Sequence, residues 1–241
     1  LYWMFFLIIL PFTISTIFLM DNSKKKNNKK FVYLYWTIFL AIFVKSLAGY
    51  EYMSTIFISM IIPFIFYAIK DSWTKYNLVK RVFLVSISAL AGFLLAMAIH
   101  ISQLAAYLGG FSKAGAAIWA TVAKRTHGDP DTVPEVYRRS LESDFSEVFV
   151  KYWNGIGFDF NSILGTFGTV SFGELIVLLL LSSLLGILMI QLKFPQYKRL
   201  HFAILVSTWV SILAPLSWYY LAKGHSYIHG HMNHVLWYVP F

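Results

Sequence analysis

The sequence predicts an all-α fold, a polytopic bundle of transmembrane helices with an outer loop that carries amphipathic helices. Hydrophobic residues make up 58% of the 241 residues and charged residues only 13%, whereas a soluble domain carries roughly 25% charged residues. The apolar residues gather in six long segments, near 1–20, 31–50, 53–69, 82–108, 173–192 and 202–221, and a seventh begins near 235. A run of about 20 apolar residues is long enough to cross a bilayer as a helix.

Each segment is predicted to be a helix because a span in lipid must satisfy its own backbone hydrogen bonds, and none shows the alternation of a barrel strand. Pro11, Pro63 and Pro215 lie inside segments and predict kinks. The first segment lacks a small-residue cleavage site, which favours a span over a signal peptide. Because the chain begins and stops inside apolar runs, we expect it to be a piece of a longer protein. The absence of cysteine excludes disulfides and thiolate metal sites.

The basic residues predict the orientation. The loops "DNSKKKNNKK", "KDSWTKYNLVKR" and "KFPQYKR" carry five, four and three of the 20 Lys and Arg residues. Since cytoplasmic loops are enriched in Lys and Arg, these three loops are assigned to the cytoplasm. The net charge of +9 is then a topology signal, and the membrane rather than nucleic acid is the expected partner.

This orientation gives three regions. Residues 1–108 form four transmembrane helices, and residues 109–172 form an extracytoplasmic loop. Residues 173–241 form two more transmembrane helices, a His-rich outer loop and the start of a seventh span.

The long loop is predicted to be structured. In "DTVPEVYRRSLESDFSEVFVKYW", Thr132 suits an N-cap, Pro134 the first turn, and apolar residues recur at helical spacing from Tyr137 to Tyr152. This pattern predicts one amphipathic helix, preceded by a shorter one over "SKAGAAIWATVAKR". The glycine-rich stretch at 154–169 follows no predicted strand and lacks a Gly-Lys-Ser/Thr ending, so it predicts a re-entrant or interfacial loop rather than a phosphate loop.

Several polar residues fall on the predicted outer side. Asp129 and Asp131 in "THGDPDT" have two interpretations, turn and cap chemistry or an acidic catalytic or metal-binding turn. Glu51 in "GYEYMSTI" ends the second segment and is either an interfacial cap or a functional carboxylate. Lys45 is expected to snorkel to the outer surface, and Glu174 to act as a helix N-terminal acid.

The stretch "KGHSYIHGHMNH" holds four of the seven histidines, His225, His229, His231 and His234. On a helix His225 and His229 share a face, but no single regular element presents all four, and Gly224 and Gly230 permit an irregular path. Three interpretations remain open: an interfacial belt, a metal site completed by Asp129, Asp131 or Glu51 and suited to zinc, manganese or iron, and an anion site with Lys223.

The stretches "GYEYMSTI", "THGDPDT" with its following helix, and "WYYLAKGHSYIHGHMNHVLWYVPF" resemble the GT-C class of membrane glycosyltransferases. The resemblance covers most of the chain loosely. It implies transfer of a sugar from a polyprenyl-phosphate carrier on the outer face, with a lipid-linked substrate and other subunits as partners.

The same resemblance implies the site residues. They are Glu51, Asp129 and Asp131 as catalytic carboxylates, Lys223, His225 and His229 as ligands of the substrate phosphate, and His229, His231 and His234 as ligands of a divalent metal (Mn, Mg or Zn). The alternatives are a His-ligated membrane oxidase or hydroxylase, a transporter, and a structural membrane subunit.

Overall fold

The computed structural model describes residues 2–23, 28–161, 168–230 and 236–237. As predicted, the fold is helical, with one two-stranded sheet among the described residues. Six regions are long and apolar enough to cross a membrane: Phe5–Asn22, Lys29–Ala48, Met53–Lys70, Lys75–Leu108, Phe172–Leu192 and Pro195–Leu221. These regions correspond to the six predicted segments.

The N-terminal bundle contains α1 (Tyr2–Asn22), α2 (Asn28–Ala48), α3 (Met53–Ser59), α4 (Ile62–Lys70) and α5 (Lys75–Leu108). Helices α2 and α5 pack closely, because Gly92 of α5 lies against the backbone of Phe39. The third span is broken between α3 and α4, where Pro63 stands in the first turn of α4, so the kink predicted from Pro63 is confirmed. Pro11 lies inside α1, which continues through it as one helix.

The C-terminal spans are α10 (Phe172–Leu192), joined by η2 (Pro195–Tyr197) to α11 (Lys198–Ser211), and α12 (Leu213–Leu221). The sixth span breaks at Ile212, just before Pro215, as the proline predicts. Helix α12 packs on α3, and the Thr55 hydroxyl donates to the Ala214 carbonyl at 2.9 Å. The side chain of Glu174 completes a capping box with Ser171 at the start of α10, which confirms its predicted N-terminal role.

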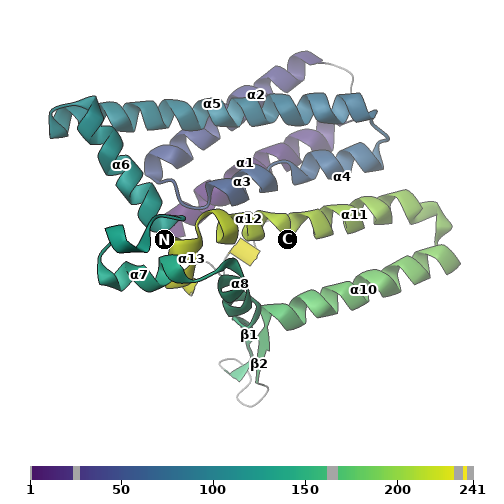
Figure 1. The fold of residues 1–241 in the computed structure, drawn as a ribbon. Helices are drawn as coiled ribbons and strands as arrows, with labels where there is room; N and C mark the ends of the chain where they lie inside the picture. The colour runs from purple at the N-terminus through teal and green to yellow at the C-terminus, as the bar shows by residue number, and fades with distance from the viewer. Residues whose placement is uncertain (1, 24–27, 162–167, 231–235, 238–241) are drawn as a thin grey trace.

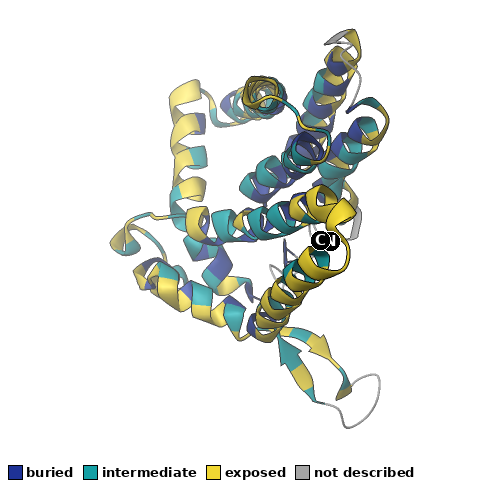
Figure 2. Cartoon of the chain, turned by 90° about the vertical axis from the view of Figure 1, so that its right-hand side faces the viewer, coloured by how far each residue is buried: buried dark blue, intermediate teal, exposed yellow. Residues whose placement is uncertain are grey.

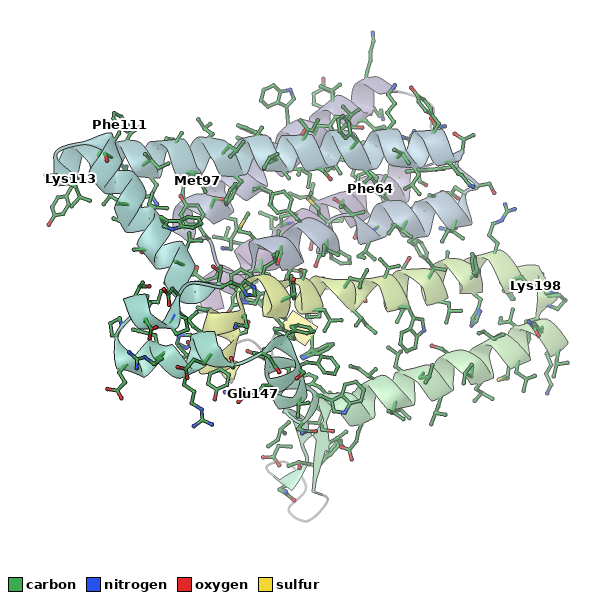
Figure 3. The ribbon with its side chains drawn as sticks, in the orientation of Figure 1. Phe64, Met97, Phe111, Lys113, Glu147 and Lys198 are labelled. Atoms are coloured by element: carbon green, nitrogen blue, oxygen red, sulfur yellow. The ribbon has the colours of Figure 1, made fainter. Side chains whose placement is uncertain are left out.

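The spans arrange the chain between two ends (Figure 1). The end of α1, the start of α2 and the connections from α4 to α5 and from α10 to α11 all lie at one end, and Lys198 marks that end in Figure 3. We call it the basic end, since its described residues include Lys29, Lys30, Lys70, Lys75 and Lys198. The α2–α3 turn and α13 (Lys223–Ile228) lie at the other end, which we call the histidine end. The fold therefore agrees with the prediction that the Lys- and Arg-rich connections share one side.

The segment between α5 and α10 differs from the prediction in two places. The short helix α6 (Phe111–Arg125) forms as expected. The single amphipathic helix does not form. Its residues divide into η1 (Pro130–Thr132), α7 (Glu135–Glu142) and α8 (Phe145–Trp153). Thr132 is part of η1 rather than an N-cap, and the break falls at Asp144, whose carboxylate accepts from the Glu147 amide at 2.8 Å and caps α8.

The second difference is a pair of strands in the stretch predicted to be a loop, whose re-entrant or interfacial position stays a prediction. Strands β1 (Ile156–Asp159) and β2 (Thr169–Ser171) pair antiparallel, with Phe158 opposite Val170 and Asp159 opposite Thr169. Figure 2 shows this hairpin projecting from the helices, and shows α10 exposed along most of its length. The short alternation in each strand is too brief to predict a strand from sequence.

Candidate functional site

Glu51 lies in a fixed turn at the histidine end, between α2 and α3. The ammonium of Lys45 donates to the Gly49 carbonyl at 2.7 Å and to the Glu51 carbonyl at 3.1 Å. Tyr52 follows with a left-handed backbone, φ 65°. The predicted snorkelling of Lys45 is wrong, since its side chain is 0% exposed. Because these two carbonyls follow the last residue of α2 and lie outside any helix, the buried ammonium supplies donors for them and holds the turn.

Arg125, the last residue of α6, reaches the Glu51 carboxylate. Its Nη1 lies 3.0 Å from Oε1, and the two side chains are 45% and 29% exposed. Partial burial acts to raise the pKa of Glu51, but hydrogen bonds from its own backbone amide and from Arg125, with the charges of Arg125 and Lys45, lower it below its ordinary value. The Glu51 carboxylate is therefore ionised at neutral pH, and its side chain is partly exposed to solvent.

His225 and His229 lie beside this ion pair. Their ring centroids are 4.7 Å apart, as expected for residues four apart on α13 and its C-cap. Burial lowers the pKa of His225 to about 4, with further lowering by His229 and Arg125, while Glu51 acts in the opposite sense. His225 is therefore neutral at pH 7, and its Nδ1 is buried without a hydrogen-bond partner among the described residues. We call Glu51, Arg125, His225 and His229 the polar cluster.

A close approach of α13 to α6 brings the cluster together. The Gly224 amide donates to the Thr126 carbonyl at 3.3 Å, and a Cβ at position 224 would lie 3.0 Å from the carbonyl oxygen of Lys124. The Tyr152 hydroxyl also donates to the Ser226 carbonyl at 2.8 Å. Gly224 is needed for contact between backbones, inside a helix, rather than for the irregular path that its residue type suggested.

Lys223, predicted to bind phosphate, ties α13 to α7. Its ammonium donates to the Leu141 carbonyl at 2.7 Å and to the Ser143 carbonyl at 2.5 Å. Two of its three ammonium donors are thus used at the C-terminus of α7. The predicted contact with phosphate stays a prediction.

Asp129 lies directly before η1, and Asp131 lies within it. The Asp129 carboxylate accepts from the Asp131 amide at 3.0 Å and so caps η1. Asp131 is 86% exposed and lies 3.8 Å from Arg138. His127 donates from Nε2 to the Tyr220 carbonyl at 2.8 Å, which ties this turn to α12. The contacts of both aspartates are those of turn and cap chemistry, one of the two interpretations offered by the sequence.

The metal prediction involves His229, His231 and His234, of which His231 and His234 lie outside the described residues. Within the described part of the chain, no three His, Asp or Glu side chains come together closely enough to hold a metal ion. A divalent metal at this end stays a prediction that depends on the two remaining histidines.

The fold also contains an apolar cavity of about 410 Å³ between spans. It lies where α1, α4, α10 and α11 meet, next to the break before Pro63. Its lining residues are Phe12, Thr16, Ile62, Pro63, Phe66, Tyr67, Leu179, Ile204, Ser207 and Thr208. A cavity of this composition suits a hydrocarbon chain.

Sequence reasoning missed Arg125 and Lys45 as parts of the site. Arg125 lies 74 positions from Glu51, and only the fold of α6 against the α2–α3 turn brings them together. Lys45 carried a signal, because a cation a few residues before the end of a helix can reach forward to the carbonyls that follow that end.

No family model matches the chain, and neither a curated protein nor a solved structure is detectably similar to it.

Proposed function

We propose that the protein is a membrane glycosyltransferase that moves a sugar from a polyprenyl-phosphate carrier to an acceptor at the histidine end. The observation that carries the proposal is the polar cluster. It combines a carboxylate ionised at neutral pH, a guanidinium and two imidazoles from three separate elements. It lies at the end opposite the basic loops, which is the extracytoplasmic end under the positive-inside rule.

Each group in the cluster suits one part of that reaction. The acceptor hydroxyl attacks the anomeric carbon, and the bond from that carbon to the phosphate oxygen breaks, with its electron pair leaving on the polyprenyl phosphate. In this proposal the Glu51 carboxylate takes the hydroxyl proton. Arg125 is 45% exposed and has further N–H groups besides the one that meets Glu51, so it can donate to the leaving phosphate.

The histidines complete this assignment. His225 is neutral at pH 7 because burial lowers its pKa, so it has one N–H donor and one acceptor nitrogen and supplies no positive charge. Arg125 is then the stronger proposed phosphate ligand, and His225 and His229, which the sequence predicts as further phosphate ligands, are the histidines of the same cluster. The apolar cavity between the spans suits the polyprenyl chain.

The test is turnover of radiolabelled polyprenyl-phosphate sugars, with glucose and mannose donors, by membranes containing the full chain. Release of polyprenyl phosphate is measured in the presence of a cell-envelope extract as acceptor. We expect Glu51→Gln to slow release about 100-fold or more, in the range for loss of a general base. Glu142→Gln, an exposed acid on α7, is the matched control and should keep the parental rate.

His225→Ala and His229→Ala are expected to lower the rate without lowering the amount of folded protein. Parental turnover by Glu51→Gln and by both histidine variants would exclude the polar cluster from the reaction. Loss of turnover on chelation, restored by Mn²⁺, Mg²⁺ or Zn²⁺, would add the predicted metal.

A further inference from the structure

Arg81 lies next to two aromatic rings at the basic end, which is the end opposite the polar cluster. Its guanidinium carbon is 3.9 Å from the centroid of the Phe31 ring and 4.2 Å from that of Trp73. Phe31 belongs to the first turns of α2, and Trp73 to the α4–α5 connection. The Trp73 indole is fixed by a 3.0 Å hydrogen bond to the Ser23 carbonyl. Three segments therefore hold the guanidinium in one orientation.

Both rings lie within cation–π distance of the guanidinium. The Nη1 atom is buried, and among the described residues it has no hydrogen-bond partner. Neither of the two ion pairs found in the described part of the chain involves Arg81. Arg81 as a whole is partly exposed, so its other N–H groups are available to an external anion, which would also lower the cost of burying this charged side chain.

The surroundings favour a phosphate group in the membrane surface. Arg81 lies in the second turn of α5, near the start of a candidate span. The described cations at this end include Lys29, Lys30, Lys70, Lys75 and Lys80, and they outnumber the two acids, Asp21 and Asp71. Basic pockets between spans at a cytoplasmic surface are recognised sites for anionic lipid headgroups.

We propose that Arg81, held between Phe31 and Trp73, binds the phosphate of an anionic phospholipid in the leaflet at the basic end. The guanidinium presents parallel N–H groups that match two phosphate oxygens, which a lysine cannot do. Binding would also join α2, α5 and the α4–α5 connection through one headgroup. The proposal requires the six spans to cross a bilayer, but it does not depend on sugar transfer.

The experiment measures lipid binding to the purified full chain by native mass spectrometry. Phosphatidylglycerol and phosphatidylcholine with identical acyl chains are titrated, and inorganic phosphate forms a third arm. We expect phosphatidylglycerol to bind tighter than phosphatidylcholine, and phosphate up to millimolar concentration not to displace it. Arg81→Lys keeps the positive charge and the ring contacts but loses the paired donors. It should weaken phosphatidylglycerol about tenfold and leave phosphatidylcholine unchanged.

Arg199→Gln is the matched control, because it removes an exposed guanidinium from the same end, and it should bind both lipids as the parent does. Arg81→Gln should abolish the preference altogether. If that variant does not fold, Arg81→Lys alone decides. Equal binding of the two lipids by the parent, or undiminished phosphatidylglycerol binding by Arg81→Lys, would overturn the proposal. Displacement of the lipid by inorganic phosphate would overturn it as well, since the site would then belong to a soluble anion.

Discussion

Replacing Lys45 by methionine tests whether a buried cation holds the turn that presents Glu51. Methionine fills a similar volume but leaves the carbonyls of Gly49 and Glu51, now 2.7 and 3.1 Å from the ammonium, without that donor. Hydrogen bonds to a charged group contribute about 1.5–3 kcal/mol each. Methionine also avoids the free-energy cost of burying a charged group, which offsets part of this loss. We therefore expect a net destabilisation of roughly 2–4 kcal/mol.

For a chain of this length, that loss corresponds to a fall in Tm of roughly 4–16 °C. The assay is thermal unfolding of the purified protein in detergent, compared with Lys113→Met, which removes an exposed lysine from α6 and should melt like the parent. Lys45→Arg, which keeps donors and charge, should recover part of the loss. If Lys45→Met melted within one or two degrees of Lys113→Met, the ammonium would not hold the turn, and the reasoning would fail.

The other predictions concern α13 and the neutral histidine. Gly224→Ala places a Cβ 3.0 Å from a backbone carbonyl oxygen and should destabilise the fold by about 1–3 kcal/mol in denaturant unfolding. Gly115→Ala, which has open space around it, should instead stabilise α6 by roughly 0.5–1 kcal/mol. Equal effects of the two substitutions would contradict the close approach of α13 to α6. Tyr152→Phe removes the donor to a buried carbonyl and should cost about 1–3 kcal/mol, which the same unfolding curves would measure. The pKa of His225 is about 4 in the folded protein against 6.5 as its ordinary value, so the unfolded chain takes up a proton first. Stability should therefore be lost as the pH falls from 6.5 towards 4, with no further change from this group above 6.5. His225→Gln should flatten that part of a Tm-against-pH curve, and an unchanged slope would show that His225 does not titrate as described.

Local patterns determined the spans and their ends. Apolar runs of about 20 residues predicted six helical regions, and the structure has six that are long and apolar enough to cross a membrane, since both properties depend on local composition. Pro63 and Pro215 marked the two broken spans, because a missing amide disrupts a helix wherever the helix lies. The capping box of Ser171 and Glu174 is likewise a local motif.

Tertiary contacts decided the site. The Arg125–Glu51 pair spans 74 positions, and the bond from Thr55 to Ala214 spans 159, so neither follows from spacing along one helix. Lys45 is buried rather than snorkelling because the turn after α2 offers it carbonyls. The sequence by itself predicted a helical chain with apolar regions long enough to cross a membrane, with basic loops on one side and the His-rich stretch on the other. Only the packing of α6 and α13 against the α2–α3 turn set the charge and accessibility of Glu51 and His225, because a pKa depends on neighbours in space rather than in sequence.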